Sequence, residues 1–486
     1  MQATVASTTL TGVEAAPVEV QADVSTGLPV FGIVGLPDTA VQEARDRVRA
    51  SLRAAGFDFP NARVIVNLAP APLRKHGTGF DLPIALAILC ATGQIPAGAL
   101  QDVTAVGELG LDGSVRQVPG MIAHALSASR EDRDLLGPSD ASGLLGVVPG
   151  LRFRAISSIA SVRAGLPQYR SACISAPTSD RVHQVDLSDI SGHASAKRAL
   201  EIAAAGGHHV LLIGPPGSGK TMLARAMCSI LPGLTDTERL ETALVHSVAG
   251  LDTSAVLEGQ RPFRAPHHSC STAGLVGGGS PPRPGEISLA HNGVLFLDEL
   301  PEFGPASLQA LRQPLEEGVV TLVRAFGTVR YPARVTVIAA MNPCPCGYSG
   351  DPVRPCTCTA GAVSRYTGRI GGPLYDRMDV CIRVDRVDPG AILDGTATGE
   401  ESTVARDRVI AARQTADVCH RGALRSMLTP GARGLLEAAA RTMNLSGRAV
   451  TRVVRVGRTI ASLDSASSIE ESHVSEALGL RSWEPS

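Results

Sequence analysis

Runs of apolar residues alternate along the chain with longer amphipathic segments, and each pattern predicts its own kind of element. The short apolar runs predict strands at 30–34, 64–68, 210–213, 294–297 and 335–340. The amphipathic or longer apolar segments predict helices at 39–55 and 82–90, and glycine and proline separate the segments. Strands that alternate with helices indicate an α/β fold.

The patterning changes along the chain and predicts three folded regions joined by a linker. Residues 1–170 mix strand and helix patterns and predict an α/β domain. Residues 171–186 are polar and aperiodic, so we expect a linker there. Residues 187–389 carry the doubly wound parallel pattern, and residues 390–486 are rich in alanine and arginine and predict a small helical domain.

The composition narrows the functional classes. The 486 residues include 45 Lys plus Arg and 46 Asp plus Glu, so no broad basic surface is available and any nucleic-acid contact must be local. Aromatic residues make up 3% of the chain, which argues against base stacking as the main binding device. Residues 1–30 carry no basic n-region, so we expect no signal peptide, and the apolar run 82–91 is too short to span a bilayer. We therefore expect a cytoplasmic protein with no membrane partner and with reduced cysteines.

The most specific motif lies between the strand at 210–213 and the helical segment that starts at 222. It reads as a P-loop, in which backbone N–H groups surround the β-phosphate of ATP, a lysine reaches the β- and γ-phosphates, and a hydroxyl holds Mg²⁺. A glycine- and proline-rich turn can share some of these residues, but the flanking strand and helix favour the P-loop. The predicted nucleotide-binding residues are Gly214, Pro215, Pro216, Gly217, Ser218, Gly219, Lys220 and Thr221.

Two further strands predict the rest of a nucleotide site. The run 294–297 ends in Asp298 and Glu299, which suit Mg²⁺ binding and deprotonation of the attacking water, respectively. Alone, such carboxylates are more often only solvated, and the upstream P-loop favours the functional interpretation. The run 335–340 is followed by Asn342, whose amide suits a position beside the γ-phosphate, although a turn former before Pro343 is the alternative.

Two cysteine pairs follow Asn342. Four thiolates this close in sequence can bind Zn²⁺ tetrahedrally, and the alternative is a set of reduced, unliganded thiols. The candidate ligands are Cys344, Cys346, Cys356 and Cys358. The isolated cysteines are expected to be packing or surface residues. The paired histidines at 208–209 and 267–268 lack a carboxylate or cysteine at ligand spacing, so we predict no metal site there.

A predicted hairpin separates the two catalytic strands. Two strand-like runs flank Gly327 within residues 319–331. Arg324 and Arg330 in this hairpin are candidates for local contact with phosphates. Pairing with Glu316 or Glu317 is the equally weighted alternative.

The order of these motifs resembles a known family. The P-loop is followed by RPFRAPHH at 261–268, GGG at 277–279 and PGEISLAHNGVLFLDEL at 284–300, and FGIVGLPD at 31–38 and NLAPA at 67–71 precede it. This order resembles the magnesium-chelatase-related branch of the AAA+ ATPases, and within it the ComM/YifB family, over nearly the whole chain. The chelatase ATPase subunit lacks such an N-terminal domain.

The resemblance implies site residues and an assembly. Arg377, in GPLYDR at 372–377, is similar to an arginine finger that reaches the γ-phosphate of a neighbouring subunit, with Arg365 and Arg369 as nearby alternatives. Arg448 in LSGRA resembles a sensor 2 arginine that contacts nucleotide from a C-terminal helical lid. The family further implies a homo-hexamer, a hairpin in the ring pore and a cysteine cluster of the kind found here.

The resemblance also implies an N-terminal domain of the ribosomal-S5/Lon-protease type. Gly79 and Ile122 stand where the Lon serine and lysine would be, so hydrolysis of peptides by that pair is not expected. Asp81 and Lys75 are treated as surface charges.

The function that the resemblance implies is ATP-driven branch migration or unwinding of single-stranded or branched DNA during homologous recombination or natural transformation, together with recombination proteins. A magnesium-chelatase ATPase subunit and a protein-remodelling motor remain the alternatives.

Overall fold

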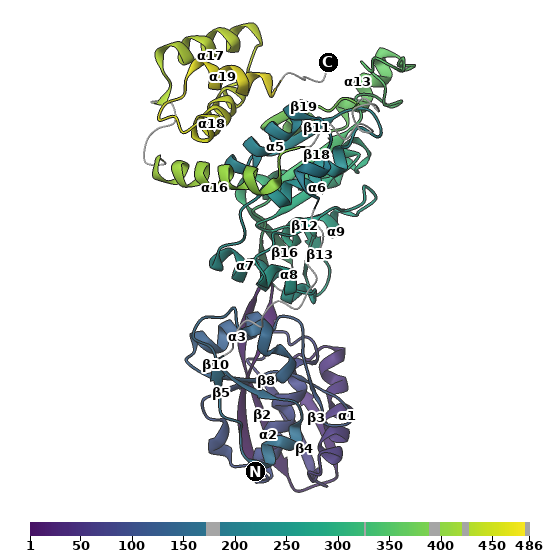
Figure 1. Cartoon of the computed structure of the whole chain (residues 1–486). Helices are drawn as coiled ribbons and strands as arrows, with labels where there is room; N and C mark the ends of the chain where they lie inside the picture. The colour runs from purple at the N-terminus through teal and green to yellow at the C-terminus, as the bar shows by residue number, and fades with distance from the viewer. Residues whose placement is uncertain (172–184, 325–326, 388–398, 420–426, 482–486) are drawn as a thin grey trace.

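The chain forms two lobes, each built on its own sheet (Figure 1). This computed structural model describes residues 1–171, 185–324, 327–387, 399–419 and 427–481. Most of the predicted linker, Cys173 and the start of the predicted helical domain lie outside the described residues.

The N-terminal lobe is a mixed eight-stranded sheet in the order β10-β9-β8-β5-β1-β2-β4-β3. The pair β1–β2 is antiparallel, and β3–β4, β1–β5 and β8–β9 are parallel. A short pair, β6–β7, lies apart from the sheet. The strands are β1 (Gln2–Thr11), β2 (Glu14–Ser25), β3 (Val30–Val34), β4 (Arg63–Ala69), β5 (Val103–Ala105), β6 (Glu108–Leu109), β7 (Val115–Arg116), β8 (Asp134–Pro138), β9 (Arg152–Ile156) and β10 (Arg170–Ser171).

Helices cover this sheet, and one of them is buried on all sides. They are α1 (Thr39–Ala54), α2 (Asp81–Ala91), α3 (Met121–Arg130) and α4 (Ser142–Leu145). Every residue of α2 is buried, because the helix packs on β1 and β2 and is also covered by α1. That position explains why its sequence is apolar on every face.

The structure corrects the predicted exposure of two charged residues in the N-terminal lobe. Lys75 and Asp81 are not surface charges, because both side chains are fully buried. Asp81 accepts hydrogen bonds from Arg47 at 2.6 and 2.9 Å, and Lys75 donates to the carbonyl of Pro70. These partners offset the desolvation cost of burying the two charged groups, which would destabilise the fold if the groups had no partner.

The second lobe contains a five-stranded parallel sheet in the order β12-β15-β18-β11-β19. Its strands are β11 (Val210–Ile213), β12 (Phe263–Arg264), β15 (Val294–Leu297), β18 (Thr336–Met341) and β19 (Val380–Arg383). Because β18 lies between β11 and β15, the segments that follow these three strands emerge side by side at the carboxyl edge of the sheet.

The remaining elements of this lobe surround the sheet. The helices are α5 (Ala194–Gly206), α6 (Lys220–Ile230), α7 (Asp236–Ala249), α8 (Ser254–Leu257), α9 (Thr272–Val276), α10 (Glu286–Leu289), α11 (Pro305–Ala310), α12 (Arg312–Glu317), α13 (Ala360–Gly368) and α14 (Gly372–Tyr375). The strand pairs are β13 (Gly277–Gly278) with β14 (Arg283–Pro284), and β16 (Val319–Arg324) with β17 (Gly327–Pro332). The predicted hairpin is therefore present.

The C-terminal part of the described chain is helical. It comprises α16 (Ser402–Cys419), α17 (Pro430–Thr442), α18 (Gly447–Leu463) and α19 (Glu471–Gly479). Thr429 and Ser446 cap α17 and α18 through their hydroxyl groups. Helix α16 packs on α5, α6 and α18, so it connects the helical group to the parallel sheet.

The two lobes share packed contacts. Helix α3 lies against α7, and the Gly120 amide donates to the Ser247 carbonyl at 2.7 Å. The turn between β1 and β2 also reaches the second lobe, where Val13 packs on the apolar cluster that contains Val329. In Figure 1 this purple strand pair extends upward out of the N-terminal sheet. Across the described ranges, no helix is both long and apolar enough to cross a bilayer.

Candidate active site and metal centre

The predicted P-loop connects β11 to α6 and has the backbone that the motif requires. Gly217 and Gly219 have φ angles of +77° and +83°, a region that glycine adopts without strain. A Cβ on Gly214 would lie 2.0 Å from the Val384 carbonyl oxygen, so only glycine fits there. Gly219 precedes the first turn of α6, whose free N–H groups and positive dipole end suit a phosphate.

Lys220 is buried at the start of α6 and faces this loop. Its Nζ donates to the carbonyls of Gly214 at 2.7 Å and Pro215 at 2.9 Å, and lies 3.4 Å from Oδ1 of Asn342. Burial lowers the pKa of the Lys220 ammonium, while the nearby Asp298 and Glu299 act to raise it. A cation in this position can exchange its carbonyl partners for phosphate oxygens.

Ser218 provides a test of whether the loop fits a phosphate group. Its Oγ is buried and, among the described residues, has no hydrogen-bond partner. A buried hydroxyl without a partner is costly unless a ligand or water bonds to it. The loop therefore fits a nucleotide phosphate, and the sequence-predicted residues of the motif lie together.

The carboxylates after β15 lie in a cavity that Thr221 of the P-loop also lines. Thr221 Oγ1 donates to Asp298 Oδ2 at 3.3 Å, so the two predicted Mg²⁺ ligands lie within reach of one ion. Thr221, Asp298 and Glu299 line a cavity of about 280 Å³. Glu299 has a φ of +51°, a strained conformation for a non-glycine residue that turns it away from the strand.

A histidine in this cavity was missed by sequence reasoning. Nδ1 of His268 lies 3.1 Å from Oε2 of Glu299, so the carboxylate partner that we judged absent is present in space. The strand β12 places it there, because β12 pairs in parallel with β15 and His268 follows β12. No motif signals this contact, since the two residues are 31 positions apart in sequence.

The predicted arginines lie elsewhere on the lobe. Arg377 and Arg448 line a second cavity of about 910 Å³, and its lining shares no residue with that of the smaller cavity. Arg377 pairs there with Glu316, the residue that we considered as a partner for Arg324 or Arg330. Arg365 and Arg369 are exposed on and beside α13 and do not line this cavity, and Arg369 pairs with Glu302 at 3.3 Å.

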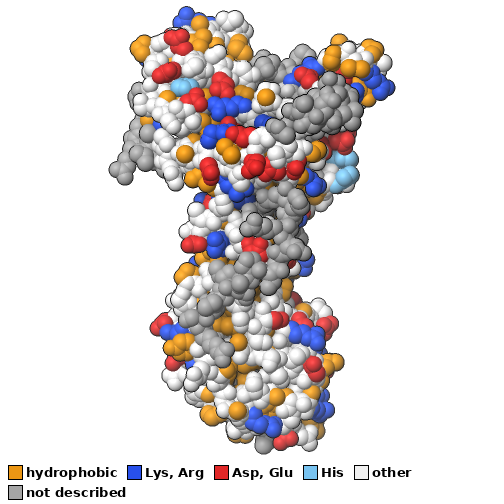
Figure 2. Space-filling model, in the orientation of Figure 1, with side chains coloured by type: hydrophobic (Ala, Val, Ile, Leu, Met, Phe, Trp, Pro, Cys, Tyr) orange, Lys and Arg blue, Asp and Glu red, His pale blue; other side chains and the backbone are white. Residues whose placement is uncertain are grey.

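The hairpin β16–β17 carries the predicted DNA contacts. Arg324 lies at the end of β16 and Arg330 lies on β17 opposite Thr321, and both side chains are exposed. Residues 325–326 at the turn are outside the described ranges. On the face shown in Figure 2, basic and acidic side chains are interspersed, which agrees with the near-zero net charge.

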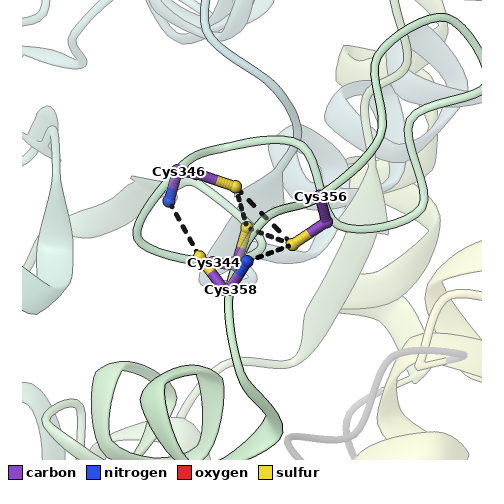
Figure 3. A group of neighbouring side chains, drawn as sticks. All are labelled: Cys344, Cys346, Cys356 and Cys358. Carbon is purple, nitrogen blue, oxygen red and sulfur yellow. Dashed lines mark hydrogen bonds between the residues drawn. The ribbon is translucent and has the colours of Figure 1, made fainter.

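The predicted cysteine cluster is assembled. One Sγ from each of Cys344, Cys346, Cys356 and Cys358 lies within 4.8 Å of all the others. Three of the Sγ pairs are 3.3, 3.6 and 3.5 Å apart (Figure 3). A tetrahedral zinc site with Zn–S bonds of about 2.3 Å requires sulfur atoms about 3.8 Å apart. The donor set and its spacing therefore fit Zn²⁺.

Backbone amides surround the four sulfur atoms. Ser349 N–H donates to Cys344 Sγ at 3.3 Å, and Cys346 N–H donates to Cys358 Sγ at 3.4 Å. Hydrogen bonds from the backbone of Thr357 and Tyr348 lower the pKa of the Cys346 thiol to about 5. By contrast, the pKa values of the adjacent Cys356 and Cys358 thiols are raised, because the one backbone hydrogen bond to each is outweighed by desolvation and the neighbouring cysteines. The backbone N–H donors are the groups in this loop that stabilise thiolate, the form that binds a metal.

Comparison with known proteins shows which protein families this chain resembles. Residues 186–392 match the family model of magnesium chelatase, subunit ChlI, residues 20–140 match that of subunit ChlI of Mg-chelatase, and residues 399–481 match that of the subunit ChlI C-terminal region. The YifB protein of Escherichia coli is 42% identical over 97% of this chain and 95% of its own length. The competence protein ComM of Haemophilus influenzae is 41% identical over 97% of this chain and 95% of its own length.

The chain belongs to the ComM/YifB family. This family lies within the magnesium-chelatase-like AAA+ proteins, as the sequence resemblance indicated. Lon protease 2 of Bacillus subtilis is 30% identical over 33% of the chain. The correspondence of Gly79 and Ile122 with a Lon serine and lysine stays a prediction, and the structure places Ile122 in the buried core.

Proposed function

We propose that this chain is an ATP-driven DNA motor that works as a hexameric ring. The observation that carries the proposal is the convergence at one sheet edge of a buried lysine, a neutral amide and two carboxylates around the P-loop. This set matches the requirements of phosphoryl transfer to water, because each group has a separate part in binding or activation.

Each residue of the site has its own role in the proposed hydrolysis of ATP. Lys220 and the amides of the P-loop would bind and orient the β- and γ-phosphates, and Asn342, 3.4 Å from the Lys220 Nζ, would position the attacking water. Thr221 and Asp298 would hold Mg²⁺, which supplies neutralisation of phosphate charge. Glu299 would accept the proton of the water at a carboxylate oxygen. Its contact with His268 must loosen before it can do so.

The second cavity supports a ring. Arg377 and Arg448 line it together, apart from the cavity of Asp298 and Glu299. An arginine that stabilises the γ-phosphate must then act on the nucleotide of a neighbouring subunit, which requires a closed assembly. We propose that both arginines act in this way and that the assembly is a homo-hexamer.

DNA is the proposed substrate. Arg324 and Arg330 are exposed on the hairpin β16–β17, where they can contact phosphates locally despite the neutral net charge. The relative from H. influenzae is named a competence protein, which agrees with handling of incoming DNA. We propose further that the cysteine cluster holds a structural Zn²⁺.

The experiment is ATP hydrolysis and strand displacement by purified full chain on forked and three-stranded DNA, with Glu299→Gln as the matched variant. We expect DNA to stimulate hydrolysis and the variant to bind ATP while losing at least about 100-fold in turnover. Stimulation by denatured protein in place of DNA would favour a remodelling motor. Stimulation only by chelatase partner subunits would favour a chelatase role.

A further inference from the structure

We propose that the cysteine cluster acts as a clamp on the nucleotide site, so that a metal ion bound by its four thiolates sets the affinity for ATP. The proposal rests on the proposed nucleotide site. It adds regulation of ATP affinity by the metal, which the binding and hydrolysis of ATP do not themselves need. It concerns the loop 344–358, which follows β18 and carries all four cysteines.

The first link is a direct contact between this loop and the P-loop. Gly347 has a φ of +88° and lies so close to Pro216 that an added Cβ would be 2.7 Å from Pro216 Cδ. The same Cβ would be 3.9 Å from Cγ of Asn342. Gly347 therefore fits between a residue of the P-loop and the predicted γ-phosphate sensor.

The second link is covalent. Cys344 is fully buried and follows Asn342 by two residues, and the Gly347 amide donates to the Cys344 carbonyl at 2.9 Å. A ligand bond to Cys344 thus fixes the backbone that holds both Asn342 and Gly347. Asn342 in turn lies 3.4 Å from Nζ of Lys220.

The third link comes from the far end of the loop. Cys358 is followed by Thr359, whose hydroxyl caps α13. Tyr366 on that helix is mostly buried and hydrogen-bonds to the backbone of Asn342. The metal ligands therefore connect to Asn342 from both ends of the loop.

These links give the metal a physical effect on the nucleotide. Between its cysteines the loop has few apolar residues to bury, and Val353 is 78% exposed, so packing alone holds it weakly. Four metal–sulfur bonds stabilise the loop conformation in place of apolar contacts, and they hold Gly347 against Pro216. Without the ion the loop can relax, and Pro216 and Asn342 lose their support.

The loop offers a matched pair of variants that keep all four thiols. Gly347→Ala adds a Cβ against the ring of Pro216, which cannot rotate away. Gly350→Ala has a similar φ of +72°, but its Cβ would meet the end of the flexible Arg383 side chain at 2.6 Å. Both variants carry the same conformational strain, and only the first one touches the P-loop.

The test measures binding of a fluorescent ATP analogue to the full chain, with zinc content measured in each sample and folding checked by circular dichroism. We expect Gly347→Ala to bind nucleotide at least tenfold more weakly with zinc retained, and Gly350→Ala to stay within twofold of the wild type. Removal of zinc by chelation should weaken binding by a similar factor, and added zinc should restore it.

Two results would overturn the clamp. The first is nucleotide affinity that does not change when zinc is removed from folded protein. The second is equal affinity of the two glycine variants. Neither result touches the proposed function, which fails separately if the wild-type chain with zinc bound does not bind ATP.

Discussion

His124 shows how one buried side chain makes stability depend on pH. It lies on α3, where its Nδ1 is 2.6 Å from the hydroxyl of Thr8 on β1, and the side chain is buried. Burial lowers the pKa of His124 from 6.5 to about 4, although a hydrogen bond to the Pro119 carbonyl acts in the opposite direction. The native state therefore keeps this histidine neutral at pH values where an unfolded chain would protonate it.

The sign of the effect follows from proton linkage. Between pH 6.5 and about 4 the unfolded chain binds a proton that the native chain does not, so the free energy of unfolding decreases as the pH falls through this window. The slope from one such group approaches about 1.4 kcal/mol per pH unit. We expect urea unfolding at pH 7, 6 and 5 to show this loss, and His124→Gln to reduce the slope. An unchanged slope in the variant would contradict the assignment.

At the scale of elements, the hairpin β16–β17 makes the clearest prediction. Arg324→Ala and Arg330→Ala should each weaken binding to single-stranded DNA. In each variant the slope of log affinity against log salt concentration should become shallower by about the amount that one phosphate contact contributes. Arg433→Ala is the control, since Arg433 is also exposed but pairs with Glu437 on α17. The measurement is fluorescence anisotropy over a salt series. Equal losses in all three variants would exclude a specific role for the hairpin.

The elements also show what sequence patterning can and cannot predict. Strands β3, β11 and β15 match their predicted ranges residue for residue, because each is an apolar run bounded by polar, glycine or proline residues. The P-loop and the cysteine cluster were also predicted, since each is local in sequence. The burial of Lys75 and the contact of His268 with Glu299 were not, because both depend on neighbours distant in sequence.

At the scale of the whole molecule, the separation of the two cavities predicts active sites shared between subunits. Glu299→Gln and Arg377→Ala should each abolish ATP hydrolysis alone. Mixed in equal amounts, they should recover activity, because about a quarter of the interfaces in random rings would join an intact Glu299 to an intact Arg377. The same recovery is expected for Arg448→Ala.

A second mixture supplies the control for that experiment. Glu299→Gln and Lys220→Ala both alter the same half of the site, so no interface between them is intact and no activity should return. Hydrolysis is measured after reassembly of each mixture from subunits. Absence of recovery in the first mixture, or recovery in the second, would exclude the shared site.

The turn at Gly12 and Val13 has a consequence for how the chain is made. It belongs to the first strands to leave the ribosome, yet it packs against Val329 and the apolar cluster around it, which are synthesised much later. The N-terminal sheet can close early in translation, while this tip stays uncovered until the β16–β17 hairpin has emerged. One of the earliest segments to be synthesised is thus among the last to find its permanent neighbours.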